Sequence, residues 1–291
     1  MNRYAVAIEY DGSAYSGWQT QKSLRTIQSL VESALSGVAA ERVEVVCAGR
    51  TDAGVHARWQ IAHFDTNVTR PMRGWVMGAN TELPRDISIT WARPVPLHFH
   101  ARYSAEARTY RYLILNRPAR SALAEKRAAV VFKPMDHERM AEAAVHLCGH
   151  YDFSAFRSSE CQSNSPIRRV ERLTVERLGE WVIIEATANA FLHHMMRNIA
   201  GLLIEVGKGE APPSWALEVR LGLDRTKGAP TAPAEGLYFW DVRYPEAFGL
   251  PGAAGSAGAA NPAGASGSAG APGPGPSGRA GERSIIIPGL N

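Results

Sequence analysis

The chain has 291 residues, 45% of them hydrophobic and 21% charged, with a formal net charge of +4, which excludes a disordered or fibrous protein and permits an anionic partner without requiring one. Three widely spaced cysteines without a CxxC pair argue against a disulfide framework or a zinc ribbon. No apolar run approaches the length of a membrane span and the first residues lack a signal-peptide core, so we expect a cytoplasmic protein without a membrane partner.

The first elements of the chain are a strand, an aromatic loop and a helix. Residues 4–10 alternate well enough to predict a strand, which ends at an Asp-Gly dipeptide. The polar segment that follows contains Tyr15 and Trp18 beside glycines, and their rings either stack on a base or pack over the edge of the core. Apolar residues recur at helical spacing over residues 27–38, which predicts a helix with Thr26 as its N-cap.

A short loop framed by two glycines presents Asp52 between two predicted strands, at residues 43–47 and 61–64. Glycine permits backbone angles and close approaches that a β-carbon forbids, so the loop presents Asp52 and its neighbour Arg50 at the mouth of a sheet. On the loop alone, Asp52 is either a turn residue that bonds its own backbone or a carboxylate presented for chemistry.

The middle of the chain continues with alternating helices and strands. Residues 72–83 predict a short helix and residues 87–91 a strand. A further strand at residues 109–115 places Tyr110 on one face, where it is either a packed aromatic residue or a substrate contact. Beyond it, Asp136 is expected to cap a helix.

The second half of the chain predicts a hairpin and then a helix. Residues 170–175 and 181–186 form the expected hairpin, and the helix begins near residue 192, with Gly207 suited to its C-cap. On that helix Arg197 borders the apolar stripe. It is either a surface cation with a buried stem or the partner of a semi-buried carboxylate.

Histidines raise the question of a metal site. The same helix would place His193 on the stripe of Arg197, with His194 next to it, and His98 and His100 are also close in sequence. Adjacent helix positions point about 100° apart and do not chelate together as i, i+4 pairs do. We therefore expect no metal.

The end of the chain changes in composition. Ser214 is the expected N-cap of a last short helix, and residues 237–244 predict a closing strand. Residues 249–291 are rich in Gly, Ala, Ser and Pro and predict a disordered tail, because few large apolar side chains are present to offset the entropy of ordering. The three isoleucines at 285–287 are either a sticky remnant or a short docking strand.

Two β-α-β-β-like halves, residues 1–105 with the Asp52 loop and residues 106–248 completing the cleft, precede the tail at 249–291. This succession predicts an α+β fold on a duplicated ferredoxin-like plan, with a mixed central sheet flanked by helices.

Over roughly residues 3–247 the sequence resembles the TruA family of tRNA pseudouridine synthases. The shared motifs are Tyr10-Asp11-Gly12 with Tyr15-Ser16-Gly17-Trp18-Gln19, Gly49-Arg50-Thr51-Asp52-Ala53-Gly54-Val55-His56, Arg108-Thr109-Tyr110-Arg111-Tyr112, Asp152-Phe153-Ser154-Ala155-Phe156-Arg157, Phe191-Leu192-His193-His194-Met195-Met196-Arg197-Asn198 and Ala232-Pro233-Ala234-Glu235-Gly236-Leu237-Tyr238. A lone Gly-Arg-Thr-Asp would be a weak signal, but these motifs in the family's order are a strong one. The tail beyond residue 249 has no counterpart in the family.

The resemblance implies the pseudouridine synthase fold and isomerisation of uridine to pseudouridine at positions 38–40 of the tRNA anticodon stem-loop, without cofactor or metal, by a homodimer. It implies that Asp52 is the catalytic carboxylate, that Tyr110 stacks on the target uracil and that Arg197 pairs with Asp52. Arg50 would fill the space left by the flipped nucleotide or bind its phosphate.

Other assignments stay open at this stage. Arg157, Arg168 and Arg169 are further candidates for contacts with RNA phosphates. Asp52 could attack the sugar, attack the base or remove a ribose proton. The competing class of function is a non-catalytic RNA-binding or RNA-folding module, against which the combination of Asp52, Tyr110 and Arg197 argues.

Overall fold

A single mixed sheet organises the fold, and the computed structural model describes residues 1–252 of the chain. The strands are β1 (Asn2–Tyr10), β2 (Val45–Cys47), β3 (His56–Thr66), β4 (Ile87–Val95), β5 (Ala107–Asn116), β6 (Ala129–Val131), β7 (Gly149–Asp152), β8 (Ile167–Leu178), β9 (Trp181–Ala188) and β10 (Leu237–Arg243). The helices are α1 (Ile27–Ala39), α2 (Met72–Glu82), α3 (His137–Val145), α4 (Met195–Gly207) and α5 (Trp215–Gly222).

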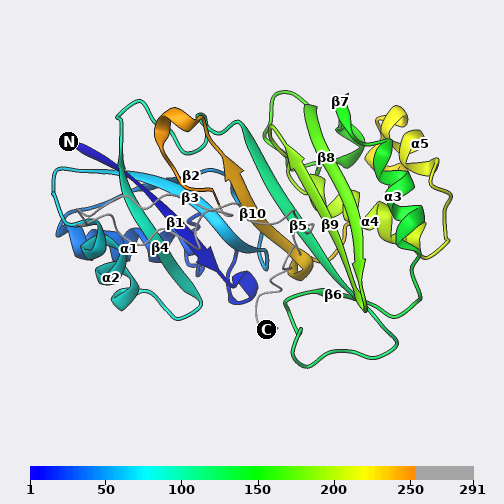
Figure 1. The fold of residues 1–291 in the computed structure, drawn as a ribbon, viewed down its shortest axis with the longest axis horizontal. Helices are drawn as coiled ribbons and strands as arrows, with labels where there is room; N and C mark the ends of the chain where they lie inside the picture. The colour runs from blue at the N-terminus through cyan, green and yellow to red at the C-terminus, as the bar shows by residue number, and fades with distance from the viewer. Residues whose placement is uncertain (253–291) are drawn as a thin grey trace, which may run out of the picture. The chain divides into compact units, whose positions relative to one another are not determined.

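The last strand within residues 1–252, β10, joins the two halves of the sheet. The strand order is β4-β1-β3-β10-β5-β9-β8-β7, with β2 paired to β3 and β6 paired to β5. Figure 1 shows β10 between β3 and β5, where it runs parallel to β3 and antiparallel to β5. Phe239 on β10 is opposite Ala57 on one side and Tyr110 on the other. The start of β3, just after the Asp52 loop, therefore lies one strand away from Tyr110.

Helices accompany each half of the sheet. Figure 1 shows α1 and α2 beside the strands of the first half, and α3, α4 and α5 beside those of the second. The aromatic rings of Tyr4, Phe64 and Trp75 pack together between the first pair of helices and the sheet, with centroids 5.1 to 5.6 Å apart. On the second half, the buried stripe of α4 includes Ile199 and Leu203. This burial of apolar surface is the main stabilising contribution to the fold.

Most of the predicted elements are confirmed. The α+β class with a large mixed sheet flanked by helices is as predicted, and so are the hairpin of β8 and β9 and the closing strand β10. Asp136 caps α3 by accepting hydrogen bonds from the backbone N–H groups of Glu138 at 2.9 Å and Arg139 at 3.2 Å. Tyr15 and Trp18 are buried, so their rings pack over the edge of the core and are not available to stack on a base.

Three local predictions need correction. Helix α4 begins at Met195 and not near residue 192, because His194 has a left-handed backbone with φ of 63° that a helix does not continue through. Thr26 and Ser214 are at the N-cap positions of α1 and α5, but neither side chain bonds the helix backbone. The hydroxyl of Thr26 instead donates to that of Ser29 at 2.9 Å.

Most of the predicted tail, residues 253–291 with the isoleucines at 285–287, lies outside the described residues. Within residues 1–252, none of the helices combines the length and the apolar character needed to cross a membrane.

Candidate active site around Asp52

The loop that carries Asp52 is anchored to β3. The backbone N–H of Ala48 donates to Ile61 O at 2.8 Å, and the Gln60 side chain bonds both the N–H and the carbonyl of Gly49. A tight turn closes the far end, where the N–H of Val55 donates to Asp52 O at 3.2 Å. The Asp52 side chain keeps 23% of its surface exposed. The carboxylate is thus neither sealed in the interior nor left on a free loop.

The segment after β1 holds the same loop from its other side. The N–H of Trp18 donates to Thr51 O at 3.0 Å, and the Tyr10 and Thr51 hydroxyls are 2.7 Å apart. Gly17 has a left-handed φ of 86°, and a β-carbon there would lie 2.7 Å from Thr51 O. Only glycine fits this close approach without strain, which explains its place in the aromatic motif.

Arg197 reaches Asp52 from the first turn of α4. Its Nη1 lies 3.2 Å from Asp52 Oδ2, and its Nε donates to Ala232 O at 2.9 Å. The N–H of Ala232 in turn donates to Arg197 O at 3.2 Å. A β-carbon on Gly201, one turn further along α4, would lie 2.1 Å from Pro230 O, so this segment rests directly on the helix. These contacts aim the guanidinium at the carboxylate and leave its side chain only 16% exposed.

Two histidines complete the surroundings of the carboxylate. His193 Nε2 lies 3.3 Å from Asp52 Oδ1, and His194 Nε2 lies 3.4 Å from Oδ2. Burial lowers the pKa of His194, Asp52 opposes that shift, and His193 and Arg197 add to it. The prediction that the two imidazoles diverge is wrong, because it assumed that both residues are helical. They precede α4, and the left-handed backbone of His194 turns both rings toward Asp52.

Tyr110 is buried on β5, close to the same loop. Its ring packs edge-on against Phe191 and Phe239, with centroids 4.8 and 5.1 Å away. A β-carbon on Gly49 would lie 3.5 Å from the Tyr110 hydroxyl and 2.9 Å from the Phe239 ring. Burial raises the pKa of Tyr110, and Tyr10 and Asp52 raise it further, so the phenol stays protonated.

The remaining predicted arginines occupy different environments. Arg50 is exposed on the Asp52 loop and has no ion-pair or hydrogen-bond partner among residues 1–252. Arg157 donates to Cys161 O at 2.6 Å, in a loop tied to the site through a bond from Ser158 N to His193 O. Arg169 is exposed beside Glu171 at 3.1 Å.

Arg168 forms more hydrogen bonds than the other arginines in this group. Its guanidinium donates to the carbonyls of Ser165 and Ile167 and to the Ser163 hydroxyl. Its N–H groups therefore stabilise the loop at residues 163–167.

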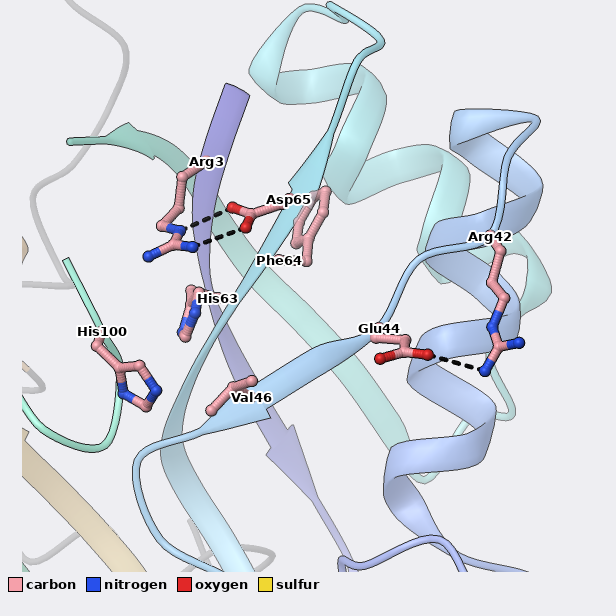
Figure 2. A pocket seen from close by; sticks show the side chains of 8 residues that line it. All are labelled: Arg3, Arg42, Glu44, Val46, His63, Phe64, Asp65 and His100. Carbon is pink, nitrogen blue, oxygen red and sulfur yellow. Dashed lines mark hydrogen bonds and ion pairs between the residues drawn. The ribbon is translucent and has the colours of Figure 1, made fainter. Parts of the chain in front are cut away.

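A separate hollow of about 490 Å³ lies on the first half of the sheet, between β1, β2, β3 and the segment at His100. Figure 2 shows that its charged side chains pair with one another, Arg3 with Asp65 at 2.7 Å and Arg42 with Glu44 at 2.8 Å. A hollow whose charges are already paired offers little to a polar substrate. We therefore place the candidate active site at Asp52 and not in this hollow.

Asp52 is a partly exposed carboxylate beside the fixed cation of Arg197 and the buried, neutral phenol of Tyr110. Such a carboxylate can act as a nucleophile or as a base toward a group that enters beside it. Sequence reasoning missed the two histidines as partners of Asp52 and missed Ala232 as the support of Arg197. The His-His pair directly before the arginine was the available signal, and the motif at residues 232–238 was the signal for the support.

Known proteins resemble this chain over nearly all of its described length. The sequence model of a family described as tRNA pseudouridine synthase matches residues 6–104 and 143–245. A protein of Methylococcus capsulatus named tRNA pseudouridine synthase A is 57% identical over 248 residues, covering 85% of this chain and 92% of that protein. Proteins of the same name from Nitrosococcus oceani and Coxiella burnetii are 53% and 51% identical, each covering 86% of this chain and 96% of the relative.

Proposed function

Because the chain belongs to the tRNA pseudouridine synthase family, whose members isomerise uridine to pseudouridine in tRNA, we propose that its targets are the uridines at positions 38–40 of the anticodon stem-loop. The similarity to proteins named tRNA pseudouridine synthase A supports this choice of substrate. The observation that carries the catalytic assignment is the meeting of Asp52 and Arg197, 145 residues apart in sequence, with Nη1 3.2 Å from Oδ2. An ion pair over that sequence separation, beside a buried tyrosine, is what a positioned catalytic carboxylate requires.

The isomerisation has a strict bond balance. The N-glycosidic bond from uracil N1 to ribose C1′ breaks, and a bond from uracil C5 to the same C1′ forms. The proton on C5 leaves and N1 gains a proton, so no oxidant or reductant is consumed. Attack on the sugar, attack on the base and removal of a ribose proton are all reactions of a carboxylate, and we assign that role to Asp52.

The other side chains position the uracil and the carboxylate and stabilise the flipped nucleotide. We assign Tyr110 to stacking on the target uracil, since its ring is held edge-on by two phenylalanines next to the Asp52 loop. Arg197 aims the carboxylate. Arg50, exposed on that loop, fills the space of the flipped nucleotide or binds its phosphate, which offsets part of the cost of extrusion.

Binding of the rest of the RNA calls for basic residues around this centre. Arg157, Arg168 and Arg169 are our candidates for phosphate contacts. Arg168 is the weakest of the three, because its donors already bond its own loop. We further propose that the protein works as a homodimer in the cytoplasm, with residues 1–105 supplying the Asp52 loop and residues 106–248 supplying Tyr110 and Arg197.

Release of tritium from tRNA carrying 5-³H-uridine tests the catalytic assignment. The Asp52→Asn variant keeps the size of the side chain and removes its charge, and we expect turnover to fall on the order of 10⁴-fold. Full release by this variant would reject Asp52 as the catalytic group. Binding of tRNA by the wild-type protein without any release would favour the non-catalytic RNA-binding module instead.

Three full-length tRNA transcripts, each with a single uridine at position 38, 39 or 40 of the anticodon stem-loop, test the target assignment. We expect pseudouridine in all three and none in a control whose only uridine lies in the acceptor stem. Modification of the control alone would show that the positions are wrong while the enzyme class is right.

A further inference from the structure

The carboxylate at the centre of the site also has the surroundings of a metal ligand. Asp52, His193 and His194 each offer one ligand atom, and these three atoms lie within 4.8 Å of one another. Each carboxylate oxygen faces one imidazole nitrogen, Oδ1 at 3.3 Å from His193 and Oδ2 at 3.4 Å from His194. Among residues 1–252 this is the one group of His, Cys, Asp and Glu side chains that converges in this way.

Each of the two nitrogen–oxygen distances is close to the spacing between neighbouring ligands of a tetrahedral ion. Zinc binds imidazole nitrogen at about 2.0–2.1 Å and carboxylate oxygen at about 2.0–2.2 Å, which puts neighbouring ligand atoms about 3.4 Å apart in a tetrahedron. Two imidazoles and one carboxylate also form the donor set of many sites that leave a coordination position open. Because the three ligand atoms already lie within 4.8 Å of one another, rotation of the side chains can bring them around one ion.

We infer that Asp52, His193 and His194 bind Zn²⁺ or a similar divalent transition metal ion, and that the bound ion inhibits the enzyme. The binding follows from geometry alone. The inhibition rests on the proposed function, since it depends on Asp52 being the catalytic carboxylate. An ion bound to that group withdraws its lone pairs from the uridine and occupies the space in front of it.

The neighbouring arginine sets a limit on the affinity. Arg197 Nη1 lies 3.2 Å from Asp52 Oδ2, and its positive charge opposes the approach of a dication. This repulsion makes the site suited to reversible occupation by a metal ion and unsuited to permanent retention. The ion is therefore an inhibitor and not a resident cofactor.

Equilibrium dialysis against Zn²⁺, without tRNA, tests the site directly. We expect one Zn²⁺ per chain in the wild-type protein and affinity at least about tenfold weaker in His193→Gln, His194→Gln and Asp52→Asn. His150→Gln is the matched control, because His150 is an exposed histidine on β7. Circular dichroism of each variant verifies that it is folded. Equal retention of Zn²⁺ by the control and by both histidine variants would overturn the inference.

Cys161 is the nearest competing ligand, because its sulfur accepts the N–H of His193 at 3.4 Å. Cys161→Ser separates the two explanations: unchanged Zn²⁺ affinity supports the His-His-Asp site, and loss of binding in this variant assigns the ion to the thiol. Visible absorption of Co²⁺ added in place of Zn²⁺ reports the ligands independently, since thiolate ligands add an intense charge-transfer band that imidazole and carboxylate do not.

Inhibition is then measured by tritium release with increasing Zn²⁺, each variant being compared with its own metal-free rate. We expect loss of release in the wild-type protein and in His150→Gln, reversal by a chelator, and at least about tenfold weaker inhibition in His194→Gln. Binding of Zn²⁺ without loss of release would overturn the inhibitory role. Absence of release from metal-free wild-type protein would instead reject the proposed function, while the dialysis result would still confirm or reject the site.

Discussion

Asp52 and Asp65 each lie beside an arginine and a histidine, yet only Asp65 forms a short two-bond pair with its arginine. Arg3 bonds both oxygens of Asp65 at 2.7 Å (Figure 2). The same guanidinium donates to the carbonyls of Leu97 and Phe99. The hydrogen bond from Arg3 lowers the pKa of Asp65. This pair joins β1 to β3 and to the segment after β4, which is a structural task.

Asp52 has longer contacts, and they come from three side chains instead of one. One guanidinium nitrogen lies 3.2 Å from it, and its other close neighbours are two imidazoles at 3.3 and 3.4 Å. The exposed fractions do not separate the two aspartates, since the Asp52 side chain is 23% exposed and the Asp65 side chain 30%. The kind of contact separates them. Asp65 is held by two short, parallel bonds from one guanidinium, which fixes it as part of the fold. Asp52 has only longer contacts to three separate side chains, which leave it able to accept a substrate or an ion.

Exchanging each aspartate for asparagine gives the sharpest separation. We expect Asp52→Asn to reduce turnover on the order of 10⁴-fold with little change in the urea midpoint. Asp65→Asn should do the reverse and lower the free energy of unfolding by about 2 kcal/mol while the folded protein keeps its turnover. Tritium release and urea unfolding of both variants measure this, and a turnover loss of equal size in both would remove the distinction.

The two arginines extend the comparison. In Arg197→Lys the charge remains, but the fork that bonds Ala232 O and Asp52 together is lost, so we expect kcat to fall about 10²-fold. Arg3→Lys should leave kcat close to wild type and lower the unfolding free energy by about 1–2 kcal/mol. Single-turnover rates and urea unfolding of the two variants measure these effects. An unchanged kcat in Arg197→Lys would contradict the positioning role.

The glycine behind the Asp52 loop tests whether backbone packing holds that loop. Gly17→Ala puts a β-carbon 2.7 Å from Thr51 O at a left-handed φ of 86°, and we expect a loss of about 2 kcal/mol in unfolding free energy. Gly37→Ala is the matched control, because no atom lies within 4 Å of its β-carbon on α1. The control should gain up to about 1 kcal/mol. Thermal unfolding that ranks the two variants the other way would disprove the packing argument.

The last effect is a pH dependence of stability near the Arg3–Asp65 pair. Burial lowers the pKa of His63 to about 4, with Arg3 and His100 acting in the same direction. The unfolded chain takes up a proton on this imidazole below about pH 6.5 and the folded chain does not, so stability is complete above that pH and falls as the pH falls toward 4.

From pH 7 to pH 5 this group contributes a loss of about 2 kcal/mol. His63→Gln removes the titrating group, so its unfolding free energy should vary less over the same interval than that of the wild-type protein. Urea unfolding at both pH values measures the difference. Parallel pH dependences in the two proteins would show that His63 does not titrate on unfolding.

Local patterns were sufficient for much of the fold. The apolar stripe of α1, the alternation in β1 and the Asp136 cap of α3 depend on neighbours a few residues away, and each was predicted from the sequence. The glycine-framed loop around Asp52 belongs to the same class, because turn geometry is decided by the residues of the turn itself. The six motifs in order also identified the family.

The family resemblance predicted Arg197 as a partner of Asp52, but only the tertiary structure showed the two histidines beside it. The position of β10 between β3 and β5 depends on pairing between strands far apart in sequence, which no local period encodes. The left-handed turn at His194 depends on how the start of α4 docks against the loops before it, so a helical period extended back to residue 192 pointed the two histidines apart. The sequence by itself thus determined that a carboxylate would be presented, and its resemblance to the family predicted the arginine partner. Only the packing of distant segments determined that two imidazoles would also meet the carboxylate, because such convergence is a property of the whole chain's folded geometry and not of any stretch within it.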